Sequence, residues 1–236
     1  MTSSKTAAKT STLFSAAFAE TYETRIDRLV PGYRLAHELT LARLAAGLPD
    51  EATILVAGAG TGTEILIQAS HRPGWRFIAI EPSPDMLAIL KARVAEAGLG
   101  DRVEIVEGTV EDADAGLRAD ACIAHLVSHF IKGDADKLAF FRAIAARLAP
   151  GAGLFHLDYL PEGGTFDPAY RAWALLAGQT NSEAATMEKR IRGSWDAAEA
   201  ERLAELLRTA GFDEPQPFFR ALDYHALASY RSPEAE

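Results

Sequence analysis

Short apolar runs alternate with amphipathic segments along most of the chain, and this alternation constrains the fold more than any other feature. Each run has the length of a strand buried on both faces. The segments between the runs carry apolar residues at helical spacing. Strands alternating with helices in this way form a parallel sheet with helices on both faces. The runs span 53–57, 75–80, 102–106, 121–126 and 153–159.

The end of the chain departs from this alternation. After a predicted helix at 196–209, the segments 217–219 and 221–227 are predicted as strands that form an antiparallel hairpin around Arg220. The fold class expected is therefore α/β: a doubly wound, mostly parallel seven-stranded sheet with a C-terminal antiparallel hairpin. We expect a flexible tail at 1–12 and one domain at 13–236. That domain includes an N-terminal helical lid at 13–47 and a helical insertion at 161–193.

Composition narrows the classes of partner. The chain has 236 residues, which fits a single domain, and a formal charge of −9 argues against a nucleic-acid partner and favours a small molecule. A single cysteine, Cys122, excludes an intrachain disulfide and a cysteine zinc cluster, so we expect a cytoplasmic protein. No apolar stretch has the length of a membrane span. Monomer and homodimer both stay open.

A glycine-rich loop follows the first buried strand directly. Gly58, Gly60 and Gly62 alternate with Ala59 and Thr61, and a helix comes next. Glycines let the backbone turn sharply and let a ligand approach without meeting a Cβ. Backbone N–H groups at the start of the helix favour an anionic group. The loop is therefore a candidate cofactor site.

Glu81 ends the second strand, where a carboxylate can accept hydrogen bonds from a ribose diol. Nicotinamide dinucleotides and S-adenosylmethionine both use this arrangement. The dinucleotide fingerprint requires a third glycine at residue 63, where this chain has Thr63. The shorter loop favours a single nucleoside that carries an amino-acid tail.

Six segments in order resemble the motifs of class I S-adenosylmethionine-dependent methyltransferases, and the resemblance extends from about Phe14 to Ala228. The segments are Ile54–Gly62, Ile80–Leu87, Ile105–Asp112, Asp120–His125, Leu148–Leu154 and Leu207–Phe212. The resemblance implies a Rossmann-like fold, S-adenosyl-L-methionine as cofactor and methyl transfer as activity. The cofactor-binding residues that it implies are Gly58, Ala59, Gly60, Thr61, Gly62, Glu81, Pro82, Met86, Thr109, Val110 and His125.

Two positions depart from the family pattern. Val56 stands where the family commonly has an acid that helps to hold the methionine ammonium, so the ammonium needs another acceptor. Thr109 stands where an acid often follows the glycine after the third strand, and Glu111 or Asp112 would serve the adenine amino group instead.

The acceptor side is less defined, and no catalytic residue is assigned. The candidate substrate-binding residues are Tyr22, Arg25, Tyr33, His129 and Tyr159, and His156 with Asp158 is a candidate base with its orienting partner. Arg28, Arg34, Lys189, Arg190 and Arg192 keep an anionic acceptor open, while Tyr170, Trp173 and Trp195 are candidates for an aromatic pocket. The spacing of His125 and His129 would suit two metal ligands on a helix, but without a third ligand we expect no metal.

The leading interpretation is methyl transfer to a small-molecule acceptor. The alternatives are an NAD(P)-dependent oxidoreductase, a non-catalytic adenosylmethionine-binding protein and an enzyme of the tRNA wobble-uridine type. The segment 22–33 resembles both small-molecule methyltransferases and the wobble-uridine group, one branch of which makes carboxy-S-adenosylmethionine.

Overall fold

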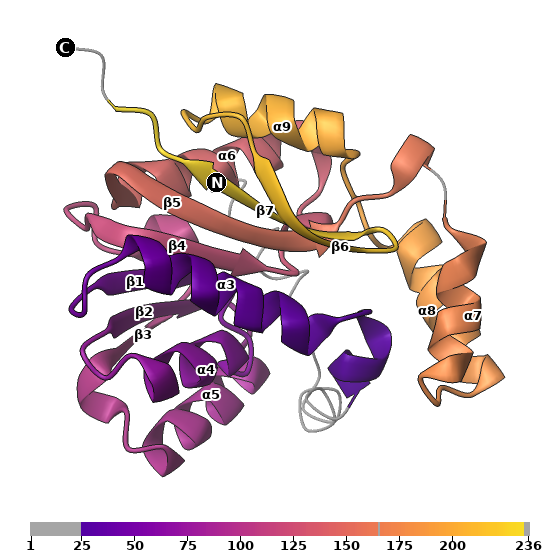
Figure 1. The fold of residues 1–236 in the computed structure, drawn as a ribbon, viewed down its shortest axis with the longest axis horizontal. Coiled ribbons are helices and arrows are strands. Elements are labelled where there is room, and N and C mark those ends of the chain that lie inside the picture. The colour runs from indigo at the N-terminus through magenta and orange to yellow at the C-terminus, as the bar shows by residue number, and fades with distance from the viewer. Residues whose placement is uncertain (1–24, 165, 234–236) are drawn as a thin grey trace.

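The computed structural model describes residues 25–164 and 166–233 and contains one seven-stranded sheet (Figure 1). Its strand order is β3-β2-β1-β4-β5-β7-β6, with β7 antiparallel to both of its neighbours and the other pairs parallel. This arrangement confirms the predicted fold class. The strands are β1 (Thr53–Ala57), β2 (Arg76–Glu81), β3 (Val103–Glu107), β4 (Ala119–His125), β5 (Leu148–Tyr159), β6 (Gln216–Ala221) and β7 (Tyr224–Tyr230).

Helices cover both faces of the sheet because both faces are apolar. Ile54 and Val56 of β1 pack in the cluster that includes helices α3, α4 and α5, whereas Leu55 and Ala57 pack in the cluster that includes α6 and α9. Figure 1 shows these two groups on opposite sides of the strands. Their bounds are α3 (Tyr33–Gly47), α4 (Thr63–His71), α5 (Pro84–Glu96), α6 (Gly133–Arg147) and α9 (Ala200–Thr209).

Two further helices, α7 (Pro168–Leu176) and α8 (Asn181–Gly193), pack together beyond the end of the sheet (Figure 1). They share an apolar cluster with Tyr33 and the segment 26–30. The Tyr170 hydroxyl donates a hydrogen bond to the carbonyl of Leu29 at 2.8 Å. These helices fall within the predicted insertion, while the tail and most of the helix expected before residue 29 lie outside the described residues. The division into tail, lid and insertion stays a prediction.

The C-terminal hairpin differs in detail from the expectation. Its turn lies at Leu222 and Asp223, and Arg220 belongs to β6. Leu222 takes a left-handed backbone conformation with φ of 52°, which no simple sequence pattern indicates for a leucine. The pairing of β7 with β5, from Gly153–Tyr230 to Tyr159–Tyr224, fixes the register and therefore the turn.

The starts of three other elements also differ from the predicted ones. Helix α6 starts at Gly133, although the apolar spacing of the sequence predicts a start at Lys137, and α9 starts at Ala200 rather than at the predicted Asp196. Strand β5 starts at Leu148 rather than at the predicted residue 153, so it includes Pro150 and Gly151, a pair that is typical of a helix end. That stretch sits at a shift in the pairing of β4 with β5, which accommodates the proline. No helix among the described residues is long and apolar enough to cross a membrane.

Candidate functional site

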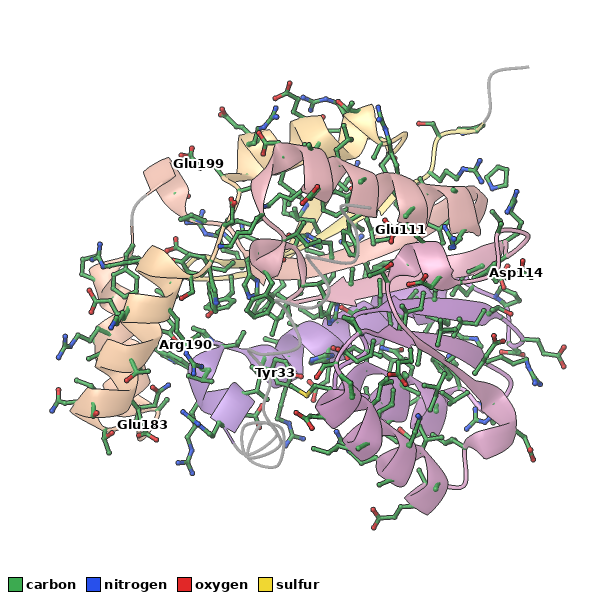
Figure 2. The ribbon with its side chains drawn as sticks, turned by 180° about the vertical axis from the view of Figure 1, so that it is seen from behind. Tyr33, Glu111, Asp114, Glu183, Arg190 and Glu199 are labelled. Atoms are coloured by element: carbon green, nitrogen blue, oxygen red, sulfur yellow. The ribbon has the colours of Figure 1, made fainter. Side chains whose placement is uncertain are left out.

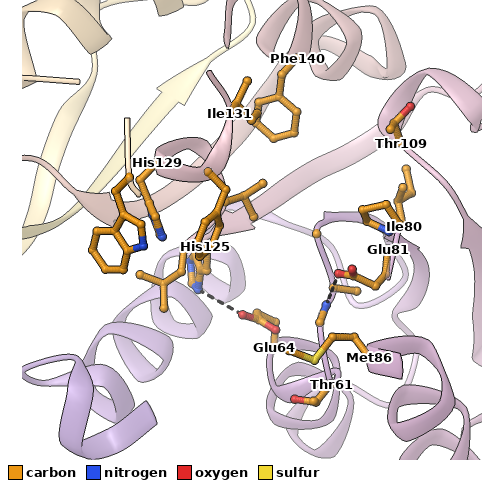
Figure 3. A pocket seen from close by; sticks show the side chains of 18 of the residues that line it. Thr61, Glu64, Ile80, Glu81, Met86, Thr109, His125, His129, Ile131 and Phe140 are labelled. Atoms are coloured by element: carbon orange, nitrogen blue, oxygen red, sulfur yellow. Dashed lines mark hydrogen bonds and ion pairs between the residues drawn. The ribbon is translucent and has the colours of Figure 1, made fainter. Parts of the chain in front are cut away.

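A cavity of about 540 Å³ opens where the carboxyl ends of β1, β2 and β4 meet. The strand order reverses between β1 and β4, and open α/β sheets bind ligands at such a switch point. Figure 3 shows Glu81 and Met86 on one side of the cavity and His129, Ile131 and Phe140 on the other. The cavity therefore has two ends, one at the glycine loop and one under an apolar wall that includes Ile131 and Phe140.

The glycine loop is tied to strand β2 by its backbone. The N–H groups of Gly58 and Ala59 both donate to the Ile80 carbonyl at 2.9 Å, and the Gly60 N–H donates to Glu81 Oε2 at 2.8 Å. Gly58, Gly60 and Gly62 all have positive φ, so glycine suits the turn. A Cβ at Gly60 would meet no atom within 4 Å, so the loop presents bare backbone at that point.

Glu81 is 7% exposed and held in one orientation by two backbone donors. Its Oε1 accepts from the Ser83 N–H at 2.8 Å, and its Oε2 accepts from Gly60. Burial raises the pKa of Glu81, while these two hydrogen bonds oppose the rise. Each carboxylate oxygen can accept more than one hydrogen bond, so both retain capacity for ligand hydroxyl groups.

The structure brings most of the predicted cofactor residues together around this cavity. Those that line it are Gly58, Ala59, Gly60, Thr61, Glu81, Pro82, Met86, Thr109, Val110 and His125. Gly62 is not part of the lining because it caps α4, where an added Cβ would lie 2.4 Å from Leu90 Cδ1. Glu111 lines the cavity, whereas Asp112 accepts hydrogen bonds from the Thr109 N–H and hydroxyl in a capping box.

Only some of the predicted substrate-binding residues line the cavity. Tyr33 and His129 line the cavity, together with Arg190 and Glu111, which Figure 2 labels with Tyr33. Arg25 and Tyr159 do not line it; the Tyr159 hydroxyl donates to Asp223 Oδ2 at 3.0 Å. Tyr22 lies outside the described residues.

His129 and Asp158 form a buried pair at the far end of the cavity. His129 Nδ1 contacts Asp158 Oδ1, and His129 Nε2 has no hydrogen-bond partner among the described residues. Asp158 also accepts from the Ser128 hydroxyl at 2.6 Å and lies 3.3 Å from His156 Nε2. Burial alone would raise the pKa of Asp158, but His129 and His156 hold it well below the usual value.

Aromatic and apolar side chains enclose this end. The rings of Phe130 and Trp195 lie 4.0 Å and 4.1 Å from the His129 ring, centroid to centroid. Of the aromatic candidates, Trp195 lines the cavity, while Tyr170 is buried in the cluster behind it. Other lining residues could not be predicted from the sequence, because nothing in their local spacing distinguishes them from core residues: Ile26, Leu29, Val30, Ile131, Phe140 and Met187.

Two buried polar residues beside the loop were also not predicted from the sequence: His37 on α3 and Glu64 on α4. Burial lowers the pKa of His37 to about 4. Burial, followed by the nearby His37 and His156, likewise lowers the pKa of His125 well below its usual value, against an opposing effect of Asp158. Both imidazoles are therefore neutral near pH 7.

Comparison with known proteins agrees with this geometry. The family model described as "Methyltransferase domain" matches residues 55–154, from β1 to β5. The carboxy-S-adenosyl-L-methionine synthase of Klebsiella pneumoniae is 24% identical over 94% of this chain and 92% of its own length. The family model and these relatives support a class I S-adenosylmethionine-dependent methyltransferase family for this chain.

Other members match over less of their length. The carboxy-S-adenosyl-L-methionine synthase of Wolinella succinogenes is 29% identical over 123 residues, half of each chain. The human N-acetylserotonin methyltransferase, solved with S-adenosylmethionine, superimposes with a TM-score of 0.57 at 17% identity, over 91% of this chain and 59% of that chain. The family model and the relatives taken together support the predicted family, enzyme class and cofactor, and a nicotinamide-dependent oxidoreductase is not favoured.

Proposed function

We propose that this protein transfers the methyl group of S-adenosylmethionine to a hydroxyl group of a small, mainly apolar acceptor. The observation that carries the proposal is one continuous cavity with a ribose-type carboxylate at one end and a histidine at the other. The methyltransferase family supports the donor. The human N-acetylserotonin enzyme, whose name specifies a small acceptor, supports the class of acceptor.

The cofactor end is proposed to consist of the glycine loop, Glu81 and the residues that line the cavity beside them. Glu81 would accept the two ribose hydroxyl groups, because backbone donors already fix its orientation. Met86 and Val110 would pack against the adenine, and Glu111 would accept from its amino group. S-Adenosylmethionine supplies a methyl group on an electrophilic sulfonium, which a nucleophile displaces in line.

The acceptor end is proposed to use His129 as general base and Asp158 as its positioning residue. Asp158 holds Nδ1 of the imidazole, so that Nε2 is presented to the cavity without a competing partner among the described residues. A hydroxyl group placed there would pass its proton to Nε2 as its oxygen attacks. The apolar wall would exclude water from the transfer.

The charge of the described lining argues for an acceptor without a strong negative charge. Arg190 is the only lysine or arginine among the described lining residues, whereas Glu64, Glu81, Glu111 and Asp136 are acids. The other arginines suggested for an anionic acceptor, Arg28, Arg34 and Arg192, are exposed and lie outside the lining.

A calorimetric titration with S-adenosylhomocysteine tests the cofactor end. We expect micromolar binding that Glu81→Ala weakens at least tenfold, about 1.4 kcal/mol or more. Glu104→Ala is the matched control, because Glu104 is exposed on the neighbouring strand β3 and should leave affinity unchanged. Equal affinity in both variants would contradict the assignment of Glu81.

A screen of small hydroxylated aromatic compounds, followed by release of S-adenosylhomocysteine, tests the acceptor end. For any acceptor found, His129→Gln should lower kcat by about 100-fold or more, with the affinity for S-adenosylhomocysteine retained. His71→Gln, on an exposed face of α4, is the control. Full turnover in His129→Gln would show that no base acts at this position.

Synthesis of carboxy-S-adenosylmethionine is a second candidate, favoured by the similarity to the Klebsiella protein along nearly the full chain. Such a product adds a carboxylate to the cofactor, and Arg190 is the described lining residue with the charge to bind it. Mass spectrometry of the ligand released from freshly purified protein separates the two candidates, because the carboxylated cofactor is heavier.

A further inference from the structure

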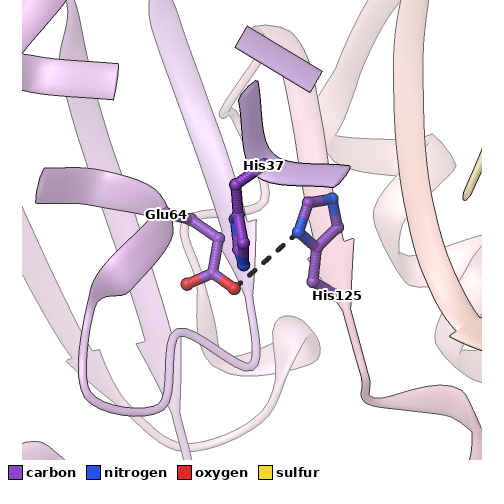
Figure 4. Close-up of side chains that lie close together, drawn as sticks. All are labelled: His37, Glu64 and His125. Atoms are coloured by element: carbon purple, nitrogen blue, oxygen red, sulfur yellow. Dashed lines mark ion pairs between the residues drawn. The ribbon is translucent and has the colours of Figure 1, made fainter. Parts of the chain in front are cut away.

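Three buried side chains from three separate elements converge beside the glycine loop (Figure 4). His37 comes from α3, Glu64 from the first turn of α4, and His125 from the last position of β4. One imidazole nitrogen or carboxylate oxygen from each lies within 4.8 Å of the others. The proposed methyl transfer uses none of the three as base or orienting group.

Thr40 fixes the tautomer of His125. The Thr40 hydroxyl donates its one proton to the Ala36 carbonyl at 2.9 Å, so toward His125 Nε2, 3.4 Å away, it can act only as acceptor. His125 therefore carries its proton on Nε2. Its Nδ1 then presents a lone pair toward Glu64 Oε1, which lies 3.8 Å away.

His37 adds a second imidazole to the same place. His125 Nδ1 has no hydrogen-bond partner among the described residues. The side chain of His37 is buried, and neither its Nδ1 nor its Nε2 has such a partner there. Its ring lies 4.9 Å from that of His125, and Tyr33 packs edge-on against it at 4.3 Å. Most buried polar atoms in native proteins have a hydrogen-bond partner, and a ligand bound between these side chains would supply one to the nitrogens of His37 and His125.

We propose that His37, Glu64 and His125 bind a divalent first-row transition-metal ion. A cation resolves the unfavourable approach of the Nδ1 lone pair to a carboxylate oxygen. Two imidazoles with one carboxylate suit zinc, iron, cobalt or nickel, whereas magnesium and calcium prefer oxygen ligands alone. The Nε2–H of His125 already has the outer hydrogen bond that orients a metal-bound histidine.

Three protein ligands leave at least one coordination position open. Glu64 and His125 also line the cavity, so we infer that the open position faces it. A ligand atom of a bound small molecule would take that position. His129, suggested as a partner of His125 by its spacing, is instead paired with Asp158.

Metal binding is measured directly and needs no methyl transfer. The full chain is treated with a chelator, dialysed, and titrated with Zn²⁺ and with Co²⁺. We expect one ion per chain by elemental mass spectrometry and visible d–d absorption from bound Co²⁺. Less than stoichiometric binding by the wild-type chain would overturn the proposal, whatever its methyltransferase activity.

Variants locate the ion. His37→Gln, Glu64→Gln and His125→Gln should each weaken binding at least tenfold, whereas His71→Gln and Glu96→Gln, both exposed, should bind as the wild type does. Thr40→Val keeps the shape of the side chain and removes the outer hydrogen bond to His125 together with the bond to the Ala36 carbonyl, so we expect about 10–100-fold weaker binding. This variant and the wild-type Co²⁺ spectrum remain decisive if a histidine variant fails to fold.

Two results would reassign the cluster. Stoichiometric binding that persists in the combined variant His37→Gln/His125→Gln would place the ion elsewhere. Loss of S-adenosylhomocysteine affinity in Glu64→Gln, with no ion bound by the wild type, would show that the cluster holds the cofactor ammonium in place of the acid missing at Val56.

Discussion

Asp158 gathers hydrogen-bond donors around one fully buried carboxylate. Its oxygens accept from the Ser128 N–H and hydroxyl, from His129 Nδ1 and from the Tyr159 N–H. It thereby links β5 to the 3₁₀ turn after β4, which carries His129. Asp158→Asn removes the charge and replaces one acceptor oxygen with an NH2 donor, so the donors at that oxygen lose their acceptor; we expect this variant to lower the free energy of unfolding by about 3–5 kcal/mol.

The carboxylate of Asp158 should also make the free energy of unfolding depend on pH. Because the pKa of Asp158 in the folded protein lies well below its ordinary value of about 3.9, its contribution is fully present above about pH 5. It is lost as the pH falls below 3.9 toward the folded value. Urea unfolding at several pH values should show a steeper acid loss in the wild type than in Asp158→Asn. Equal slopes would mean that Asp158 does not carry the acid sensitivity.

At the scale of elements, the glycine loop joins β1 to α4 and also sets the approach of α5. Gly62 caps α4 with φ of 86°, and Leu90 of α5, fully buried, occupies the space where a Cβ would go. Gly60 has φ of 53° but open space around it. A substitution at Gly60 therefore tests backbone strain alone, whereas one at Gly62 tests backbone strain together with the packing of α5.

We expect Gly60→Ala to cost about 1–2 kcal/mol from the left-handed backbone alone. Gly62→Ala should cost about 1–3 kcal/mol more, because Leu90 must move within a packed core. Thermal or urea unfolding of the ligand-free variants checks this difference. Equal losses would show that α5 shifts freely and that the loop does not fix its position.

For the molecule as a whole, the cavity joins distant parts of the chain, because residues as far apart as Tyr33, Glu81 and Met187 line it. A ligand that binds only the folded chain stabilises all of it. S-Adenosylhomocysteine at about 100 times its Kd should add about 2.7 kcal/mol, which corresponds to a rise in Tm of about 5–10 °C. Differential scanning fluorimetry should show this rise for the wild type, no rise with NADH, and a smaller rise for Glu81→Ala at equal ligand concentration.

The sequence alone determined those elements and cofactor residues whose positions depend on spacing within a short segment. A strand of five residues, a glycine loop and a helix follow one another within 53–71, so their order could be predicted from apolar periodicity and glycine placement. Glu81 could be predicted because it ends the next strand along the chain, and parallel strands end at the same edge. For the same reason most of the cofactor residues named from the motifs line the cavity.

Only the tertiary structure decided which distant side chains meet. His37, Glu64 and His125 come together because the sheet places β4 beside β1 while α3 and α4 pack on one face, a contact that no spacing within a segment encodes. The hairpin turn lies at Leu222 and not at Arg220, where the sequence predicted it. The pairing of β7 with β5 sets this position, because the register of a strand depends on its partner strands. Local sequence sets which backbone conformations are favourable, whereas contacts across tens of residues depend on how the packed layers bury their apolar faces.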